Sequence, residues 1–221
     1  MAPTHVRSAH ARPSGGVISI RTGALAGIVG PAVFWCVLLL LGRAQPAYSV
    51  ARSEISLLAL GPYGWVQTAS FIGFGLLILA FQAGLLRAVA PGSTWRPINI
   101  LAISPGLALV ALAVFPTDRT GGIWTIHGEI HLGVVGAMAI LLPASCLAAA
   151  QEMAPNSAWR GYARFSTLIG LATCVCAAAL LLAWIGWWPA SHPWLGLFER
   201  VAFALPSLWM EVVAIRLLRL S

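Results

Sequence analysis

Six long runs of apolar residues occupy most of the chain and decide what it can fold into. An α-helix rises about 1.5 Å per residue, so about 20 apolar residues cross the roughly 30 Å hydrocarbon core of a bilayer. Only a helix satisfies the backbone of a single segment there. The sequence therefore predicts an all-α polytopic membrane protein, a bundle of six transmembrane helices in one domain over residues 22–218. The six runs are residues 22–42, 62–86, 97–115, 124–150, 165–188 and 194–218.

The composition excludes a water-soluble domain. Hydrophobic residues make up 59% of the 221 residues and charged residues 9%, whereas charged residues make up about 25% of soluble domains. Residues 1–21 differ, because arginine and histidine stand there among proline, serine and glycine. Such a segment cannot bury enough surface to fold alone, so it is predicted to be a basic, disordered cytoplasmic tail. The first apolar run is too long for the core of a signal peptide, which favours an uncleaved first helix.

The arginines predict how the helices are oriented. With the N-terminus inside, nine of the thirteen basic residues, all arginine, fall in inner segments, and four fall in outer ones, namely Arg43, Arg52, Arg119 and Arg200. Positive residues concentrate on the cytoplasmic side of membrane proteins. Both termini are therefore predicted to be inside, in a multi-pass protein of the cytoplasmic (inner) membrane. The predicted partner is the lipid bilayer and not nucleic acid, because arginines beside apolar helices are orientation signals; the oligomeric state is left open.

The ionisable residues gather on the side that is predicted to be outside. Residues 115–131 hold two histidines, an aspartate, a glutamate and an arginine in a chain with few charges. Four of the six acids and every histidine beyond the tail fall in outer segments: Glu54, Asp118, Glu129, Glu199, His127, His131 and His192. The sequence thus predicts a polar site that faces outward.

His127 and His131 are four residues apart, which places both rings on one face of a helix. This spacing suits two ligands of one metal ion or a proton relay. Asp118 and His192, from neighbouring outer segments, would complete a metal site, for which zinc is the candidate. In the alternative interpretation, the histidines cap the helix and anchor it among the lipid headgroups. Glu129 lies two residues from each histidine, so the His-Glu-x-x-His motif of metalloproteases is absent.

Three further groups each have a chemical and a structural interpretation. Asp118 stands where a span ends, and it suits a general base, a metal ligand, an arginine partner or a loop cap. Ser53 and Ser56 suit a nucleophile beside His131, although serines in such loops usually form turns and caps. Glu211 is the single acid well inside a span, which indicates a proton path or a structural pair.

Three short segments carry a resemblance to a known family: 61–65 (GPYGW), 115–118 (FPTD) and 128–131 (GEIH). From its first predicted helix to its last, the chain resembles the membrane family called domain of unknown function 998 (DUF998). The resemblance implies a multi-helix membrane fold, with Asp118 and His131 as signature positions. It implies no particular reaction.

Two functions are compatible with the sequence. The first is an outer-face enzyme that acts on a lipid or another amphipathic substrate, with Asp118, His131 and His127 as catalytic residues. The mouth of its site would be lined by Trp124, Glu129, Trp188 and Glu199. The second is a non-catalytic carrier or sensor, in which Asp118, His131 and Glu211 hold protons or a small molecule.

Overall fold

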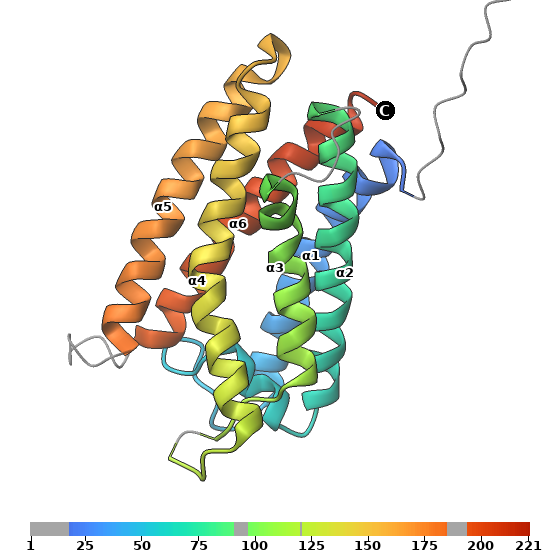
Figure 1. Cartoon of the computed structure of the whole chain (residues 1–221). Helices are drawn as coiled ribbons and strands as arrows, with labels where there is room; N and C mark the ends of the chain where they lie inside the picture. Colours follow the sequence, from blue (N-terminus) through green and yellow to red (C-terminus); the bar gives the residue numbers. More distant parts are fainter. Residues whose placement is uncertain (1–17, 91–96, 120, 185–193) are drawn as a thin grey trace, which may run out of the picture.

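In the computed structural model the described residues are 18–90, 97–119, 121–184 and 194–221, so the predicted tail lies almost entirely outside them. Within these ranges the chain is helical and contains no β-strand, which confirms the all-α class (Figure 1). The elements are α1 (Ile20–Ala44), η1 (Ile55–Leu60), α2 (Gly64–Val89), α3 (Pro97–Val114), α4 (Ile126–Met153), η2 (Ser157–Trp159), α5 (Arg160–Trp184) and α6 (Leu195–Leu218).

Five of these helices are long and apolar enough to cross a membrane, namely α1, α2, α4, α5 and α6. The third predicted span corresponds to α3, whose apolar stretch, Asn99–Val114, is shorter than the others. The structure therefore supports a multi-pass helical protein with five helices of spanning length. That α3 also crosses the membrane remains a prediction.

Side-chain caps define where two of the helices begin. The Ser19 hydroxyl accepts a hydrogen bond from the Thr22 amide at 3.0 Å, at the start of α1. The Thr125 hydroxyl accepts one from the Gly128 amide at 3.1 Å, at the start of α4. Each hydroxyl satisfies an amide that has no partner within the first helical turn. The cap at Thr125 matters most here, because it fixes the end of α4 that carries the histidines.

The helices form a ring, because each packs against the next one in sequence and α6 packs against α1. Glycines let neighbouring backbones come close. A Cβ on Gly23 of α1 would lie 2.7 Å from the Cα of Gly84 of α2, and one on Gly75 of α2 would lie 2.6 Å from the carbonyl oxygen of Gly106 of α3. Small residues at crossings are typical of helices that associate within a membrane.

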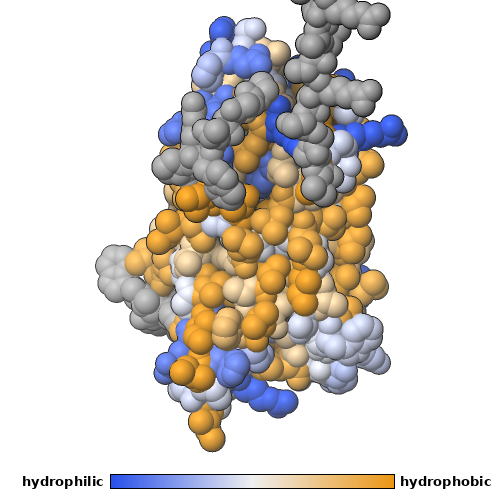
Figure 2. All heavy atoms as spheres, turned by 45° about the vertical axis from the view of Figure 1, so that its right-hand side comes forward, coloured by the Kyte–Doolittle hydropathy of each residue, from blue (hydrophilic) through white to orange (hydrophobic). Residues whose placement is uncertain are grey.

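The inside and the outside of the ring are both apolar. Inside, Phe34 is 1% exposed and stacks on Phe74 with the ring centroids 4.6 Å apart. Outside, Leu40, Ile140 and Val175 are 65%, 68% and 70% exposed. Figure 2 shows a broad hydrophobic belt, with hydrophilic side chains gathered toward the two ends. An apolar surface of this extent is suited to contact with lipid rather than with water.

The segments that carry the ionisable residues lie together at one end of the ring. Residues 45–63, which include η1, follow α1, and residues 115–125 connect α3 to α4. Figure 1 shows both segments at the lower end, beside the start of α6, whereas the start of α1 and the C-terminus lie at the upper end. We call this lower end the loop end. It is the end that the arginine pattern predicts to face outward.

Candidate functional site

A cavity of about 380 Å³ opens at the loop end. It is lined by α4, by the last residues of α5 and the first turns of α6, and by the two loop segments. Its polar lining comprises Glu54, Ser56, Thr117, Asp118, Arg119, His131 and Glu199. Its apolar lining includes Trp124, Leu132, Val135, Ala139, Leu180 and Leu181. One cavity therefore offers ionisable groups and a hydrocarbon surface side by side.

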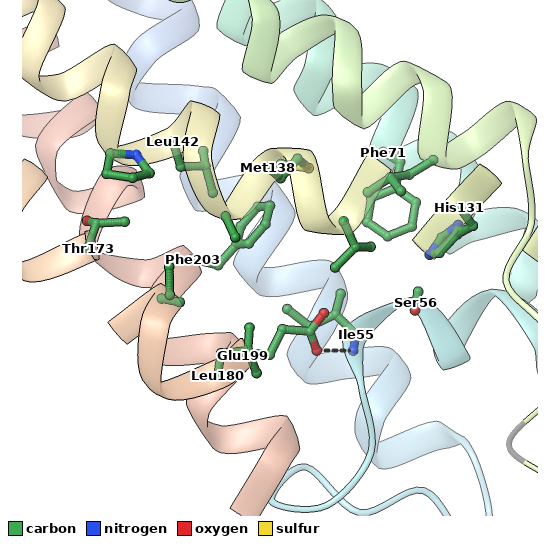
Figure 3. A pocket seen from close by; sticks show the side chains of 16 residues that line it. Ile55, Ser56, Phe71, His131, Met138, Leu142, Thr173, Leu180, Glu199 and Phe203 are labelled. Carbon is green, nitrogen blue, oxygen red and sulfur yellow. Dashed lines mark hydrogen bonds between the residues drawn. The ribbon is translucent and has the colours of Figure 1, made fainter. Parts of the chain in front are cut away.

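A smaller cavity of about 50 Å³ adjoins the first and extends into the ring of helices. Both cavities are lined by Ser56, His131 and Glu199. The rest of the smaller lining is mainly apolar and includes Phe71 and Phe203 (Figure 3). The three shared polar residues thus stand where the open cavity meets the hydrophobic interior.

His131 is buried, and its hydrogen bond fixes its tautomer. Only 3% of the residue is exposed, and its Nδ1 lies 2.7 Å from the carbonyl oxygen of Phe115. A carbonyl oxygen can only accept, so Nδ1 carries the proton and Nε2 of the neutral ring is an acceptor. Nε2 is buried and has no hydrogen-bond partner among the described residues. Figure 3 shows the ring directed into the space that Ser56 and Glu199 also border.

Asp118 holds Thr125, the N-cap residue of α4, in place. Its Oδ2 accepts from the Thr125 amide at 2.7 Å, and its Oδ1 accepts from the Thr125 hydroxyl at 2.9 Å. A carboxylate at this position also interacts favourably with the N-terminal end of the helix dipole. The structural interpretation of Asp118 as a cap is therefore realised, and the same carboxylate lines the cavity with His131.

Two glutamates face the cavity from different parts of the chain. Glu199, in the second turn of α6, accepts a hydrogen bond through Oε2 from the Ile55 amide at 2.7 Å, and it lines both cavities (Figure 3). Glu54 precedes η1, is half-buried and lines the larger cavity. Burial raises the pKa of the Glu54 carboxyl above its ordinary value, because a charged carboxylate loses hydration there. The site therefore holds acids whose charge is incompletely solvated.

Arg200 fastens the first loop segment to α6. Its guanidinium donates to the carbonyl oxygens of Ser53 at 2.9 Å and of Gly196 at 2.8 Å, and it also donates to the Tyr48 hydroxyl. The Leu197 amide adds a bond to the carbonyl oxygen at position 51, at 3.0 Å. These bonds direct the Arg200 charge toward the loop backbone. They also place Glu54 and Ser56 on the cavity.

The structure separates the predicted site residues into three groups. Asp118, His131, Trp124 and Glu199 all line the larger cavity. His127 and Glu129 are exposed and do not line it, and the His127 ring packs beside the Phe115 ring with centroids 5.8 Å apart. Trp188 and His192 lie outside the described residues.

The predicted zinc site is not assembled by the residues that the structure describes. Among them, no group of three or more His, Cys, Asp or Glu side chains is arranged to hold a metal ion. His127, His131 and Asp118 therefore do not converge as metal ligands. The reason is local: α4 begins at Ile126, so His127 lies in its exposed first turn while His131 lies one turn deeper, between packed helices.

Sequence reasoning gave little weight to Glu54 and Ser56, which the fold brings to the cavity. The signal for Glu54 was present, because it is one of the few acids and falls in an outer segment. Nothing in the local sequence shows that residues 53–55 bond to α6, about 145 positions further along the chain.

The fold and the site together define a class: a multi-pass helical protein with helices of membrane-spanning length and an amphipathic cavity at one end. The chain belongs to the family described as Protein of unknown function (DUF998), whose family model matches residues 28–216. This match confirms the resemblance seen in the sequence. No curated protein and no solved structure matches the chain. The family description assigns no reaction.

Proposed function

We propose that this protein spans the cytoplasmic membrane six times, with both termini inside, and that its cavity is the outward-facing active site of an enzyme. The substrate is a lipid or another amphipathic molecule. The topology is supported by the five helices of spanning length and by the arginine pattern. α3 has 18 residues, which corresponds to a length of about 27 Å and is close to the thickness of the hydrocarbon core.

The lining of the cavity supports an amphipathic substrate. Leu132, Val135 and Ala139 of α4 and Leu180 and Leu181 of α5 give the cavity an apolar wall, and five ionisable residues also line it: Glu54, Asp118, Arg119, His131 and Glu199. Trp124, which is 66% exposed, stands at its edge. Binding sites commonly combine an apolar wall with a few polar groups that orient the ligand. An alkyl chain would lie along the apolar wall of this cavity, and a polar headgroup would lie beside the ionisable residues.

The main observation that supports an enzymatic role is that Nε2 of His131 is free to accept a hydrogen bond. It is buried without a hydrogen-bond partner in the described part of the chain, while Nδ1 is held by Phe115. A buried acceptor without a partner is costly unless a bound molecule satisfies it. An imidazole fixed in this tautomer is also suited to take a proton from a bound group or a water. We therefore assign His131 as the general base, with Asp118 and Glu199 setting the electrostatic environment.

The substitution His131→Asn tests this role. The asparagine amide can still donate to the Phe115 carbonyl oxygen, but no group replaces Nε2. With the purified protein in vesicles of mixed membrane lipids, we expect product formation, followed by mass spectrometry, to fall by about a hundredfold or more. The melting temperature should change little, since the hydrogen bond to Phe115 is retained.

His127→Asn is the matched control, because it makes the same change one turn earlier, at an exposed residue outside the cavity. It should leave product formation unaltered. Full activity of His131→Asn, or an equal loss in both variants, would contradict the assignment of His131 as the base.

A carrier is the second candidate, and one feature favours it. A third cavity, of about 30 Å³, lies beyond the two described above. It shares Leu142 and Phe203 with the cavity of about 50 Å³, and its lining includes Gln82. The three cavities are separate but adjacent, and together they extend from the loop end into the ring of helices, as a transport path would. Glu211, the predicted proton-holding acid, does not line them. Proton-dependent uptake into vesicles that is lost in Glu211→Gln, with no product formed, would favour the carrier over the enzyme.

A further inference from the structure

We propose that the cavity binds a primary ammonium group carried on an apolar chain, and that Glu54, Glu199 and His131 hold this group. The proposal rests on the proposed function, because it names the headgroup of the amphipathic molecule that the same cavity takes. It is carried by two properties of the lining: the hydrogen-bonding groups are mainly acceptors, and most of the charges are negative.

Three acceptors are available to a ligand. Glu199 uses Oε2 for the Ile55 amide, which leaves Oε1. His131 offers Nε2, which is buried and has no partner in the described ranges. The Glu54 carboxylate has no hydrogen-bond partner within the part of the chain that the structure describes. A primary ammonium carries three N–H donors, which equals the number of these acceptors.

The charges of the lining favour a cation in the same place. Three carboxylates, those of Glu54, Asp118 and Glu199, line the larger cavity, and Arg119 is the one arginine in its described lining. Arg119 is exposed and also lines a shallow hollow on the outer surface, so water and salt screen its charge. Arg200 is buried and does not line the cavity; it keeps its positive charge, which acts on the neighbouring Glu199, but its hydrogen bonds run to the loop backbone and not to the carboxylates of the lining. An anionic headgroup would therefore meet like charges, whereas an ammonium would meet opposite ones.

The helices provide space for the apolar chain of the ligand. Gly136 of α4 lines the cavity, and a Cβ built on it would meet no atom within 4 Å. The neighbouring wall consists of Val135 and Ala139 from α4 with Leu180 from α5. An alkyl chain buried there is removed from contact with water, which favours its binding. The ammonium end would then lie beside the glutamates.

Four ligands with the same decyl chain test the proposal: decylamine, decyltrimethylammonium, decanol and decanoate. Their binding is measured by isothermal titration calorimetry on the full chain in a neutral maltoside detergent near pH 8, where decylamine is still protonated and Glu54, whose pKa is raised by burial, is more fully ionised than at pH 7. We expect decylamine to bind about tenfold more tightly than decanol. It should also bind more tightly than decyltrimethylammonium, which has no N–H donor, and decanoate should bind most weakly.

Isosteric variants identify the groups that hold the ammonium. Glu199→Gln removes a charge but keeps an oxygen that can accept from the Ile55 amide. It should weaken decylamine binding about tenfold and leave decanol binding unchanged. Glu54→Gln should act in the same direction. Glu129→Gln is the matched control, because it removes an exposed carboxylate of α4 outside the cavity. An equal loss in Glu129→Gln, or equal binding of decylamine and decanol by the wild type, would overturn the proposal.

One further pair of variants separates this proposal from the proposed function. Leucine in place of Gly136 would fill the cavity, whereas leucine in place of the exposed Gly133, which also has open space around it, would not. If decylamine and decanol bind equally and both are lost in Gly136→Leu alone, the ammonium proposal fails and the amphipathic cavity stands. If the wild type binds no decyl ligand, both proposals fail.

Discussion

At the scale of single residues, Glu54 links the cavity to pH. Burial raises the pKa of Glu54 above the ordinary value of 4.5, so the folded state holds this proton more tightly than the unfolded chain does. Below that value both states are protonated and burial costs little. As the pH rises, the unfolded chain ionises first, and the folded state loses stability until the pH exceeds the folded pKa. We expect Glu54→Gln, which cannot ionise, to raise the melting temperature at about pH 8 and to leave it unchanged at about pH 4.

The measurement is the apparent melting temperature of the full chain in detergent, without added ligand, at both pH values. Glu129→Gln, at an exposed acid of the same end, gives the effect of removing a negative charge there. A gain for Glu54→Gln of the same size at both pH values would show that the effect comes from packing rather than from ionisation.

At the residue level, the sequence is most informative about the lining of the cavity where the residue type itself carries the signal. Acids and histidines are so rare in this chain that Asp118, His131 and Glu199 could be selected from composition and predicted sidedness, and all three line the cavity. The spacing of His127 and His131 was less informative. A four-residue interval predicts a shared helix face, but it does not reveal that α4 begins at Ile126 and leaves His127 exposed.

At the scale of elements, the start of α4 depends on a tight contact between Gly128 and Asp118. A Cβ on Gly128 would lie 1.9 Å from Oδ2 of Asp118, so alanine would displace the carboxylate from Thr125. We expect Gly128→Ala to destabilise the protein by about 1 kcal/mol, the usual cost of losing a helix cap. Gly133→Ala, on the same helix with open space around it, should be neutral or gain up to about 1 kcal/mol in helix propensity. Denaturant unfolding followed by tryptophan fluorescence measures both, and equal stability of the two variants would rule out the contact.

The helices were predictable and the loop end was not, for a physical reason. A helix is specified by the apolar residues of its own run, so the predicted run 62–86 and the observed α2, Gly64–Val89, nearly coincide. The first loop segment is held instead by distant groups: Arg200 and Glu199 of α6 bind its backbone. Gly196 lets it approach so closely that a Cβ there would lie 2.4 Å from the Ser53 carbonyl oxygen. Contacts between residues so far apart in the chain cannot be predicted from the sequence of either segment alone.

At the scale of the whole molecule, the positions of the loops bear on the proposed crossing of the membrane by α3. The segment between α1 and α2 and the segment between α3 and α4 lie at the same end of the ring (Figure 1). The start of α1 and the C-terminus lie at the opposite end. If α3 did not cross, the two segments would be on opposite sides of the membrane. The arrangement is compatible with the six crossings proposed above, of which α3 has the shortest apolar stretch.

Cysteine labelling tests the crossings and their direction together. Tyr63 and Ile123 are 50% and 88% exposed in the two loop segments, and Ser157 is exposed at the opposite end, between α4 and α5. In intact cells, a membrane-impermeant maleimide should label Tyr63→Cys and Ile123→Cys, whereas Ser157→Cys should react only after permeabilisation. The unsubstituted protein measures the background from the native cysteines, which all lie within helices.

Labelling of Tyr63→Cys and Ile123→Cys from opposite sides would show that α3 does not cross. Labelling of Ser157→Cys alone in intact cells would reverse the predicted orientation, and the cavity would then face the cytoplasm.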